Sequence, residues 1–462
     1  MTSEDLHYRV SPERLAWGVL LIAFAVFCFI IVGSVLAVHH YAFRSSLPMD
    51  MLLQVGSGTV GVKFPNTAEQ AATSQRNLTG DTTIRTTTTD RWSQTVLSFR
   101  DERADESLVA TVTLKSATSL HLRSASRPRF DWSTSVYWIE ITELSGEIDV
   151  RISDVFAHPV EVYVSTTSGA EIRLTSGGTY RIQALDTRVH ATNVSGEAVM
   201  IVPDRLTAVS IPMGEEGVID TETSTLVRHP ALVDLVANSE LATSMPAASA
   251  GEALADPPFV WNCSSGPPTN LPSGRYRADV APDGRRGFRL VRSEGADTNG
   301  YTRCEQTLGE AREGVDVTGY DYLSLQTTLY IDYQSLSLCG VDGSECPLMV
   351  QVKFIDVNGN PGEWIHGIYA RLDPGTNAPR RCATCLDNHL QIYEKTWYVY
   401  NSENLFTLFQ ESQRPAVVTE VVFYASGHQY DVYVDEVALL AGNLQELTET
   451  FNGDDEPVFE VG

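Results

Sequence analysis

Six of the seven cysteines lie in the C-terminal half of the chain, where they could form disulfides or bind a metal ion. They are Cys263, Cys304, Cys339, Cys346, Cys382 and Cys385. The pair Cys382-Ala-Thr-Cys385 lies close to His389, and with Cys339 and Cys346 it offers a set of ligands for zinc. A redox site of the C-x-x-C type would need a βαβ setting, which the surrounding sequence does not predict.

Disulfides explain the same cysteines more simply. An even number of cysteines confined to one region is typical of a disulfide framework in an oxidising compartment. We therefore prefer disulfides to zinc, and proximity along the chain suggests the pairs Cys263–Cys304, Cys339–Cys346 and Cys382–Cys385.

The chain contains no motif that predicts catalysis. The patterns G-x-S-x-G, H-E-x-x-H and the Gly-Lys phosphate loop are all missing from the sequence. Gly56-Ser-Gly-Thr-Val-Gly61 fits the dinucleotide pattern G-x-G-x-x-G, but Val62-Lys-Phe-Pro65 follows it and predicts a strand and a break instead of the required helix. We expect no catalytic residues and no enzymatic activity.

The charge of the chain argues against a nucleic-acid partner. The formal net charge is −26, and only four lysines occur. Binding to a phosphate backbone needs clustered Lys and Arg side chains, which this composition does not supply. The acidity predicts a soluble, self-repelling surface.

An unbroken uncharged run covers Leu15–Val38 and predicts a transmembrane helix. At about 1.5 Å per residue, this run is long enough to cross the bilayer core. A cleaved signal peptide is the alternative, because Ser34-Val-Leu-Ala37 could serve as a weak cleavage site. Its apolar core would be shorter, so we favour an uncleaved signal-anchor.

Charges that flank this run predict the topology. Arg9 and Arg14 precede the run and only Arg44 follows it closely, which places residues 1–14 in the cytoplasm. The cysteines agree, because disulfides form outside the cytoplasm. We therefore expect a single-pass protein of the cell membrane, with the bulk of the chain extracytoplasmic.

Short alternating strands dominate the remainder, and we expect an all-β protein behind the span. Only residues 229–241 show a helical pattern, with leucines and a valine near one face. The expected parts are a stalk (39–50), a β domain (51–225), a short helix and Ala/Ser/Pro linker (226–258), a second, disulfide-bearing β domain (259–442) and an acidic disordered tail (443–462).

The first β domain resembles the exocytoplasmic FecR-like domain. The phrases that carry the resemblance are Gly58-Thr-Val-Gly-Val62, Leu78-Thr-Gly-Asp81, Leu144-Ser-Gly-Glu-Ile-Asp-Val150, Gly178-Thr-Tyr-Arg-Ile182 and Asn193-Val-Ser-Gly-Glu-Ala-Val199. The resemblance implies a roll or solenoid of stacked β-hairpins. Some FecR-like proteins relay a signal to a cytoplasmic sigma factor through a domain ahead of the span. Residues 1–14 are too few to fold into such a domain, so we expect a tether more than a transducer.

The second β domain resembles jelly-roll, galactose-binding-like domains of the carbohydrate-binding-module type. The expected strands lie in 316–335, 348–357, 363–372 and 417–439, and the closing phrase Tyr430-Asp-Val-Tyr-Val-Asp-Glu-Val437 carries the resemblance best. It implies a β-sandwich that holds sugars on aromatic rings. The candidate ligand-binding residues are Trp364, His366, Tyr398, Tyr400, His428 and Tyr430.

Packing in the core is the alternative role of these aromatic residues. Along 397–400 the side chains alternate, so one pair must face inward. Such modules often bury a structural calcium ion, which the resemblance assigns to Glu305 or Asp435. Asp356-Val-Asn-Gly-Asn360 looks like the start of a calcium loop, but Pro361 stands where the loop needs glycine, so a hairpin turn explains it better.

We therefore expect a membrane-anchored extracytoplasmic binding protein of bacterial type that recognises carbohydrate or another surface component. It would contact the lipid bilayer through Leu15–Val38 and need no cofactor beyond the structural calcium ion. A structural or assembly subunit of a cell-envelope complex, with no small ligand, is the alternative. A transmembrane signal transducer is the third hypothesis.

Overall fold

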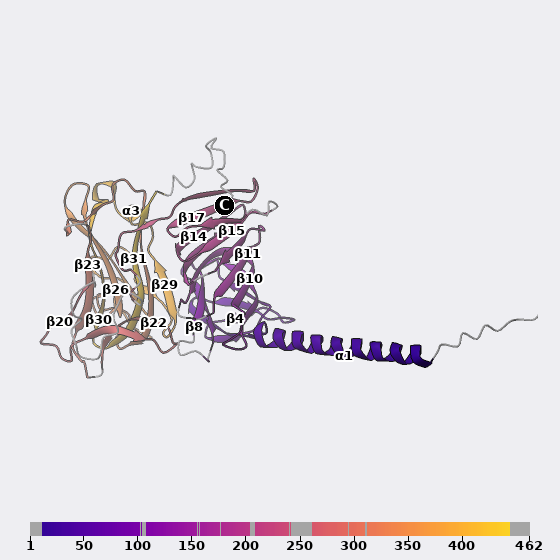
Figure 1. The fold of residues 1–462 in the computed structure, drawn as a ribbon. Helices are drawn as coiled ribbons and strands as arrows, with labels where there is room; N and C mark the ends of the chain where they lie inside the picture. The colour runs from indigo at the N-terminus through magenta and orange to yellow at the C-terminus, as the bar shows by residue number, and fades with distance from the viewer. Residues whose placement is uncertain are drawn as a thin grey trace, which may run out of the picture.

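The computed structural model describes residues 12–101, 103, 108–154, 156, 158–175, 177–203, 208–239, 241, 261–293, 295–309 and 312–443. A long N-terminal helix leads into a first β domain, and a second β domain lies beside the first (Figure 1). The expected all-β fold with one apolar N-terminal helix is confirmed. The acidic tail from residue 444 onward lies outside the described residues.

Helix α1 (Pro12–Phe43) contains the predicted span and continues beyond it. Its Ala16–Phe43 portion is long and apolar enough to cross a membrane, and none of its most apolar stretch is buried in the protein. The expected stalk at 39–50 is wrong. Helix α1 takes up residues to Phe43, and strand β1 (Ser46–Pro48) follows almost at once, because its backbone pairs with a strand of the first β domain.

The first β domain contains strands β1 to β18. Those after β1 are β2 (Asp50–Ser57), β3 (Val60–Lys63), β4 (Gln70–Ala72), β5 (Arg76–Leu78), β6 (Thr82–Thr86), β7 (Gln94–Arg100), β8 (Leu108–Leu114), β9 (Ser119–Pro128), β10 (Tyr137–Ile152), β11 (Val160–Thr166), β12 (Glu171–Leu174), β13 (Gly178–Ala184), β14 (Arg188–Ser195), β15 (Ala198–Ile201), β16 (Ala208–Ile211), β17 (Glu215–Asp220) and β18 (Thr225–Pro230).

Strand β10 joins the two sheets of this domain. Its first half pairs with β9 and β11, and its second half pairs with β8 and β13 in the other sheet. The strand changes sheets at Gly146, which has φ of 102° and lies against the backbone of Thr118, so no side chain fits there. Hairpins β11–β12, β13–β14, β15–β16 and β17–β18 then alternate between the sheets around one core of Val, Ile and Leu side chains.

The helix expected at 229–241 is not formed over residues 229–239. Strand β18 continues to Pro230, and β19 (Val233–Asp234) pairs with a strand of the second β domain. The apolar residues Val236 and Leu241 both enter the core of that domain, Val236 from a bend. Tertiary pairing therefore overrides the local pattern, and residues 242–258, the expected linker, lie outside the described residues.

The second β domain is a sandwich of two largely antiparallel sheets, as expected. Its elements are β20 (Asn262–Gly266), β21 (Arg275–Val280), β22 (Arg286–Arg292), β23 (Gly300–Thr307), β24 (Val315–Asp316), β25 (Tyr322–Gln334), β26 (Leu348–Asp356), β27 (Pro361–Tyr369), β28 (Leu390–Gln391), β29 (Trp397–Asn401), α3 (Leu405–Leu408), the 3₁₀ turn η2 (Glu411–Gln413), β30 (Pro415–Gly427) and β31 (Tyr430–Gly442).

In one sheet the order is β21-β22-β31-β25-β29, and in the other it is β20-β23-β30-β26-β27-β28. The apolar core lies between the two sheets. The turn between β26 and β27 is the predicted hairpin: Asp356 Oδ1 accepts hydrogen bonds from the backbone N–H groups of Asn358 and Asn360, both at 2.8 Å. Asp356 Oδ1 therefore stabilises the turn in the segment whose sequence looked like the start of a calcium loop.

The two β domains dock through edge strand β29. The side-chain amide of Gln94, on β7, donates to the carbonyl of Val399 (3.0 Å) and accepts from its N–H (2.7 Å), as a neighbouring strand would. Trp397 and Tyr433 of the second domain pack against Val96 of the first in a small apolar cluster. The interface is therefore buried and hydrogen-bonded, which sequence analysis did not anticipate.

Candidate ligand-binding cavity

Three of the six predicted ligand-binding residues line one cavity of about 440 Å³ between the two domains. Trp364 and His366 project from β27 and Tyr400 projects from β29, so the cavity lies where the two sheets of the sandwich end. The segment before β7 closes it with Asp90, Arg91 and Trp92, and the segment around β28 adds Arg380, Asp387 and His389.

Four rings form a continuous stack along this cavity. Trp92 stacks on Tyr400 with ring centroids 5.7 Å apart, Tyr400 stacks on His366 at 4.9 Å, and His366 stacks on Trp364 at 6.0 Å. Trp364, His366 and Tyr400 are buried, and Trp92 is half-buried. Ring faces are therefore largely used by other rings, and a ligand would meet mainly ring edges and polar groups.

His366 is the most unusual group in the cavity. Burial, with smaller contributions from His389 and Arg91, lowers the pKa of His366 to about 3, so the imidazole is neutral at physiological pH. Its Nε2 atom is buried and has no hydrogen-bond partner among the described residues. A buried polar atom without a partner is costly, so this atom fits a hydrogen bond to a ligand hydroxyl or to water.

Charged groups form the polar rim. The Arg91 guanidinium is ion-paired with Glu403 and lies 4.7 Å from the ring centroid of Trp92. Asp90 Oδ1 accepts a hydrogen bond from the backbone N–H of Trp92 (2.9 Å), which fixes the start of the segment. Carboxylates and guanidinium groups beside apolar rings can bind a neutral ligand that carries many hydroxyls.

The other three predicted residues do not line this cavity. Tyr398 is buried, its hydroxyl donates to the carbonyl of Trp92 (3.0 Å), and burial raises its pKa. Tyr430 is buried, with its hydroxyl 2.7 Å from that of Thr302, and burial raises its pKa to about 12. His428 lies in the turn between β30 and β31. Tyr398 and Tyr430 thus pack the core, which was the alternative interpretation.

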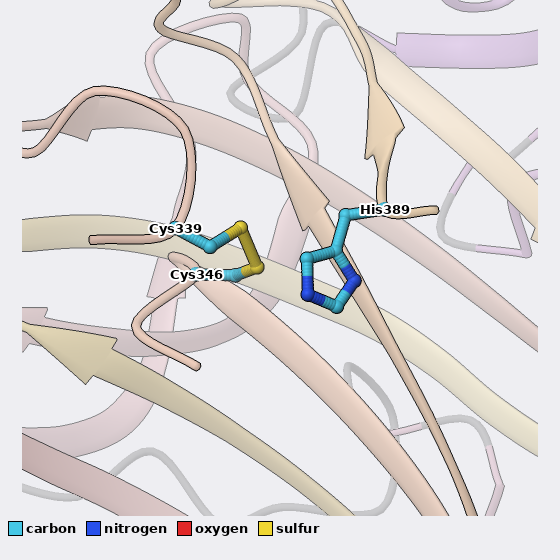
Figure 2. Close-up of side chains that lie close together, drawn as sticks. All are labelled: Cys339, Cys346 and His389. Atoms are coloured by element: carbon cyan, nitrogen blue, oxygen red, sulfur yellow. A yellow bond between two sulfur atoms is a disulfide. The ribbon is translucent and has the colours of Figure 1, made fainter. Parts of the chain in front are cut away.

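The three predicted disulfides are confirmed as Cys263–Cys304, Cys339–Cys346 and Cys382–Cys385. Figure 2 shows that His389 lies beside Cys339–Cys346, and these three are the one group of potential metal ligands within the described ranges. The bonding of these three residues leaves no free ligand atom for a zinc ion. Both sulfurs are in a disulfide, His389 Nδ1 accepts from Gly367 N–H (2.9 Å), and Nε2 donates to the Gly343 carbonyl (2.7 Å).

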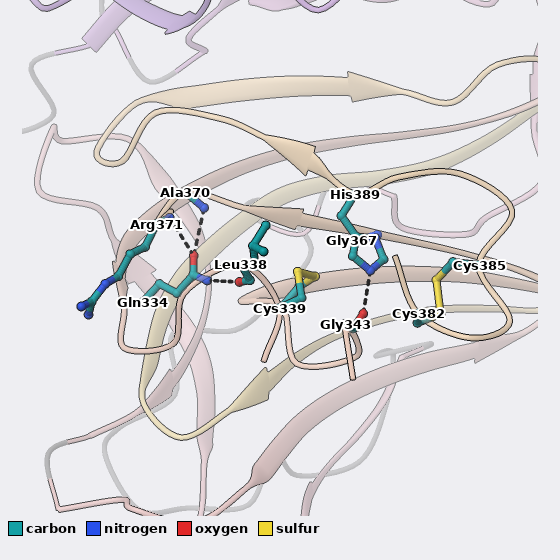
Figure 3. The surroundings of a disulfide bond; sticks show 11 residues. Gln334, Leu338, Cys339, Gly343, Gly367, Ala370, Arg371, Cys382, Cys385 and His389 are labelled. Atoms are coloured by element: carbon teal, nitrogen blue, oxygen red, sulfur yellow. Dashed lines mark hydrogen bonds between the residues drawn. A yellow bond between two sulfur atoms is a disulfide. The ribbon is translucent and has the colours of Figure 1, made fainter. Parts of the chain in front are cut away.

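These contacts brace the wall of the cavity. Figure 3 shows His389 between the disulfides Cys339–Cys346 and Cys382–Cys385. It also shows Gln334, whose side-chain oxygen accepts hydrogen bonds from the N–H groups of Ala370 (2.9 Å) and Arg371 (3.2 Å). Burial lowers the pKa of His389, which keeps it neutral and able to accept from Gly367. The loop that carries Asp387 is flanked by Cys382–Cys385 on one side and by the hydrogen-bonded His389 on the other.

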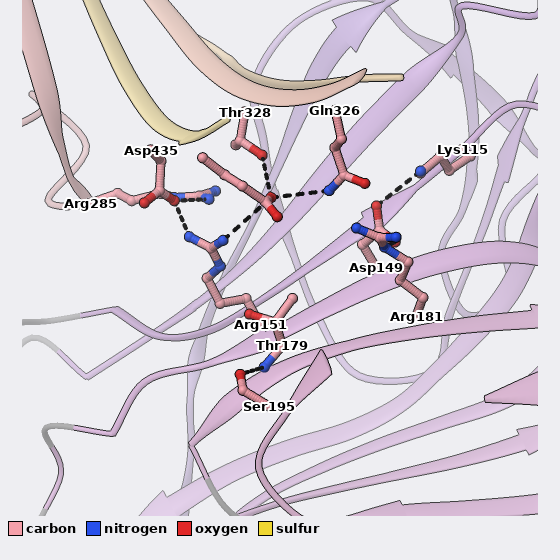
Figure 4. Close-up of polar contacts among 11 residues, drawn as sticks. Lys115, Asp149, Arg151, Thr179, Arg181, Ser195, Arg285, Gln326, Thr328 and Asp435 are labelled. Carbon is pink, nitrogen blue, oxygen red and sulfur yellow. Dashed lines mark hydrogen bonds and ion pairs between the residues drawn. The ribbon is translucent and has the colours of Figure 1, made fainter. Parts of the chain in front are cut away.

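The residues proposed for calcium are engaged elsewhere. The carboxylate of Asp435 accepts from Arg285 Nε (2.9 Å) and is ion-paired with Arg151 of the first domain (Figure 4). Burial opposes its charge, but Arg151 and Arg285 outweigh burial and lower the pKa of Asp435. Glu305 lies on the other sheet and pairs with Arg303 at 2.8 Å. Both carboxylates are therefore paired with arginines, and a calcium ion at either residue stays a prediction.

Sequence reasoning missed the contribution of the first domain to the cavity. Asp90, Arg91 and Trp92 lie more than 270 positions before Trp364 in the sequence. The one local signal was a tryptophan in an otherwise polar stretch, Thr86-Thr-Thr-Thr-Asp-Arg-Trp92, between two strands. Such a side chain usually marks a contact.

No family model and no curated protein matches this chain. Among the solved structures similar to parts of it is a protein described as an anti-sigma factor from Parabacteroides distasonis, with 12% identity over 32% of this chain and a TM-score of 0.23. Another is a family 11 carbohydrate-binding module from Clostridium thermocellum in complex with a tetrasaccharide, with 12% identity over 40% of this chain and 90% of that chain and a TM-score of 0.22. The xylan-binding domain CBM22-1 of Paenibacillus barcinonensis Xyn10C gives 10% identity over 46% of this chain and 97% of that chain, with a TM-score of 0.23.

The match spans 51% and 59% of the length of the two anti-sigma factor structures. At these TM-scores the similarities establish neither a family nor a function for this chain. The FecR-like and jelly-roll resemblances stay predictions.

Proposed function

We propose that this protein is a single-pass, membrane-anchored binding protein that recognises a carbohydrate outside the cytoplasm. Helix α1 supports the anchor, and the three disulfides support an oxidising compartment for the β domains. The cavity between the domains supports the ligand class.

One observation carries the choice of ligand: the buried, neutral imidazole of His366 with its unpartnered Nε2. A cationic or anionic ligand would gain little from a neutral ring, whereas a sugar hydroxyl can bond to this nitrogen. Aromatic edges and the carboxylates and guanidinium groups of the rim supply the apolar and polar contacts that a sugar ring needs. The volume of about 440 Å³ fits one small saccharide unit.

Titration of the full-length protein in lipid nanodiscs with a panel of oligosaccharides tests the proposal. His366→Ala removes the bond to Nε2, and we expect affinity to fall roughly 5- to 150-fold, corresponding to about 1–3 kcal/mol. Release of reducing ends in the same samples would show hydrolysis, which this proposal of binding without catalysis does not expect.

Arg91→Ala and Arg123→Ala form a matched pair of milder variants. Both arginines belong to the first domain, both pair with a glutamate, and their side chains are 65% and 62% exposed. Only Arg91→Ala should weaken binding. Absence of binding across the panel, or equal affinity of His366→Ala and the unmodified protein, would overturn the proposal.

A further inference from the structure

The segment of residues 129–135, between β9 and β10, is hydrogen-bonded to the C-terminal end of helix α1. The carbonyl oxygen of Phe43, in the last turn of the helix, accepts hydrogen bonds from Thr134 N–H (2.9 Å), Thr134 Oγ1 (2.9 Å) and Ser133 Oγ (2.8 Å). Carbonyls at the end of a helix lack donors within the helix. The first β domain supplies those donors here, so it is fastened to the helix end.

Backbone pairing continues this attachment without a linker. Arg129 N–H donates to the carbonyl of Ser45 (3.2 Å), and β1 then pairs with β9 from Ser46 opposite Pro128 onward. Figure 1 shows α1 leaving the first β domain directly at the domain surface. The helix and the domain are therefore held in one relative orientation, and this segment sits at the level where the helix would leave a bilayer.

An aromatic cluster of Tyr41, Phe130 and Trp132 occupies this junction. Phe130 stacks on Trp132 with centroids 4.8 Å apart and planes 9° apart, and its ring meets that of Tyr41 edge-on at 5.6 Å. Trp132 is 64% exposed and Tyr41 is 54% exposed. Among the described tryptophans outside α1, only Trp132 is exposed. Water is a poor environment for such a cluster.

Charges around the cluster differ from those of the chain as a whole. Arg44 is exposed, Arg129 lies 5.1 Å from the ring centroid of Tyr41, and Arg103 pairs with Asp101 and with the exposed Asp131. These groups sum to about one positive charge, whereas the whole chain carries −26. Arginine beside exposed Trp and Tyr is the composition found where proteins meet lipid headgroups.

We propose that Phe130 and Trp132 insert into the headgroup region of the bilayer that α1 crosses, as a second membrane contact of the first β domain. This inference rests on the proposed membrane anchor. The contact fixes the two β domains at a set angle to the membrane, so the cavity is presented in one orientation.

Fluorescence quenching of the full-length protein in vesicles tests this contact. The vesicles contain phospholipid brominated close to the headgroup, and the two variants are Trp132→Phe and Trp138→Phe. Trp138 belongs to the same domain and stacks on Tyr163, so it is the matched control. We expect Trp132→Phe to reduce the quenched signal to that of Trp17 in the helix, and Trp138→Phe to leave the quenched signal unchanged.

The outcomes separate the inference from the anchor. Equal quenching in the unmodified protein and Trp132→Phe, with Trp17 still quenched, overturns the inference and leaves the anchor intact. That result would point to a second copy or another protein as the partner of the cluster. Absence of all quenching overturns the anchor and the inference together.

Discussion

Replacement of Asp435 by asparagine tests most directly what holds the two β domains together. Asp435 is 1% exposed and its carboxylate serves Arg285 of its own domain and Arg151 of the first domain. Asparagine keeps the size but removes the charge, so Arg285 loses the carboxylate that it binds, whereas Arg151 keeps Glu436 at 3.7 Å. Arg285 is itself buried against Trp397, 4.4 Å from its ring centroid. Breaking a buried pair in this way costs about 3–5 kcal/mol.

Acid should weaken the same interaction in the unmodified protein. The pKa of Asp435 in the folded state lies below its ordinary value of 3.8 because the two arginines outweigh burial. The contribution of the Asp435 carboxylate to stability is therefore complete above its pKa in the unfolded chain, and it is lost as the pH falls through its pKa in the folded protein. The difference in stability between the protein and Asp435→Asn should shrink below about pH 4.

Urea unfolding of the full-length protein in detergent micelles, followed by tryptophan fluorescence, measures these changes. Asp373→Asn is the control, because Asp373 pairs with Arg371 at 2.9 Å while 46% of its side chain is exposed, and its loss should cost less than about 1 kcal/mol. Arg151→Met should also cost less in the Asp435→Asn background than alone. A cost below about 1 kcal/mol for Asp435→Asn would refute this account of domain docking.

Two further predictions concern the second domain. Removal of Cys263–Cys304, which spans a separation of 41 residues, should lower the free energy of unfolding by about 4 kcal/mol, whereas removal of Cys382–Cys385, with a separation of 3, should lower it by about 2 kcal/mol. Thermal unfolding of the two double-alanine variants measures the difference, and equal losses would contradict the prediction. Burial raises the pKa of Asp234 from 3.8 to about 6, so its charge destabilises the folded chain above pH 6, and this penalty disappears as the pH falls below 4. The free energy of unfolding of Asp234→Asn should therefore exceed that of the unmodified protein by up to about 3 kcal/mol at pH 7 and by nothing at pH 4. A variant with the same pH dependence as the unmodified protein would exclude this role.

The cavity shows how far local reasoning reached. Aromatic residues on β27 and β29 could be selected from the sequence, because strands and their alternation are visible there. Whether a ring faces the core, the cavity or the other domain depended on the position of each strand in the sandwich. Tyr398 and Tyr400 point inward together, yet only Tyr400 meets the cavity, and Trp92 completes its stack from a different domain.

Local chemistry in the sequence determined the apolar helix, the β character of both domains, the hairpin at Asp356 and the pairing of the cysteines. Each of these depends on residues close together in the chain, where spacing and turn preference are sufficient. The tertiary structure decided that residues 229–239 form strand and turn, that Asp435 pairs with arginines and that the two domains enclose a cavity. These features depend on contacts between distant segments, and side-chain partners at long range are set by packing of whole sheets, which no local pattern encodes.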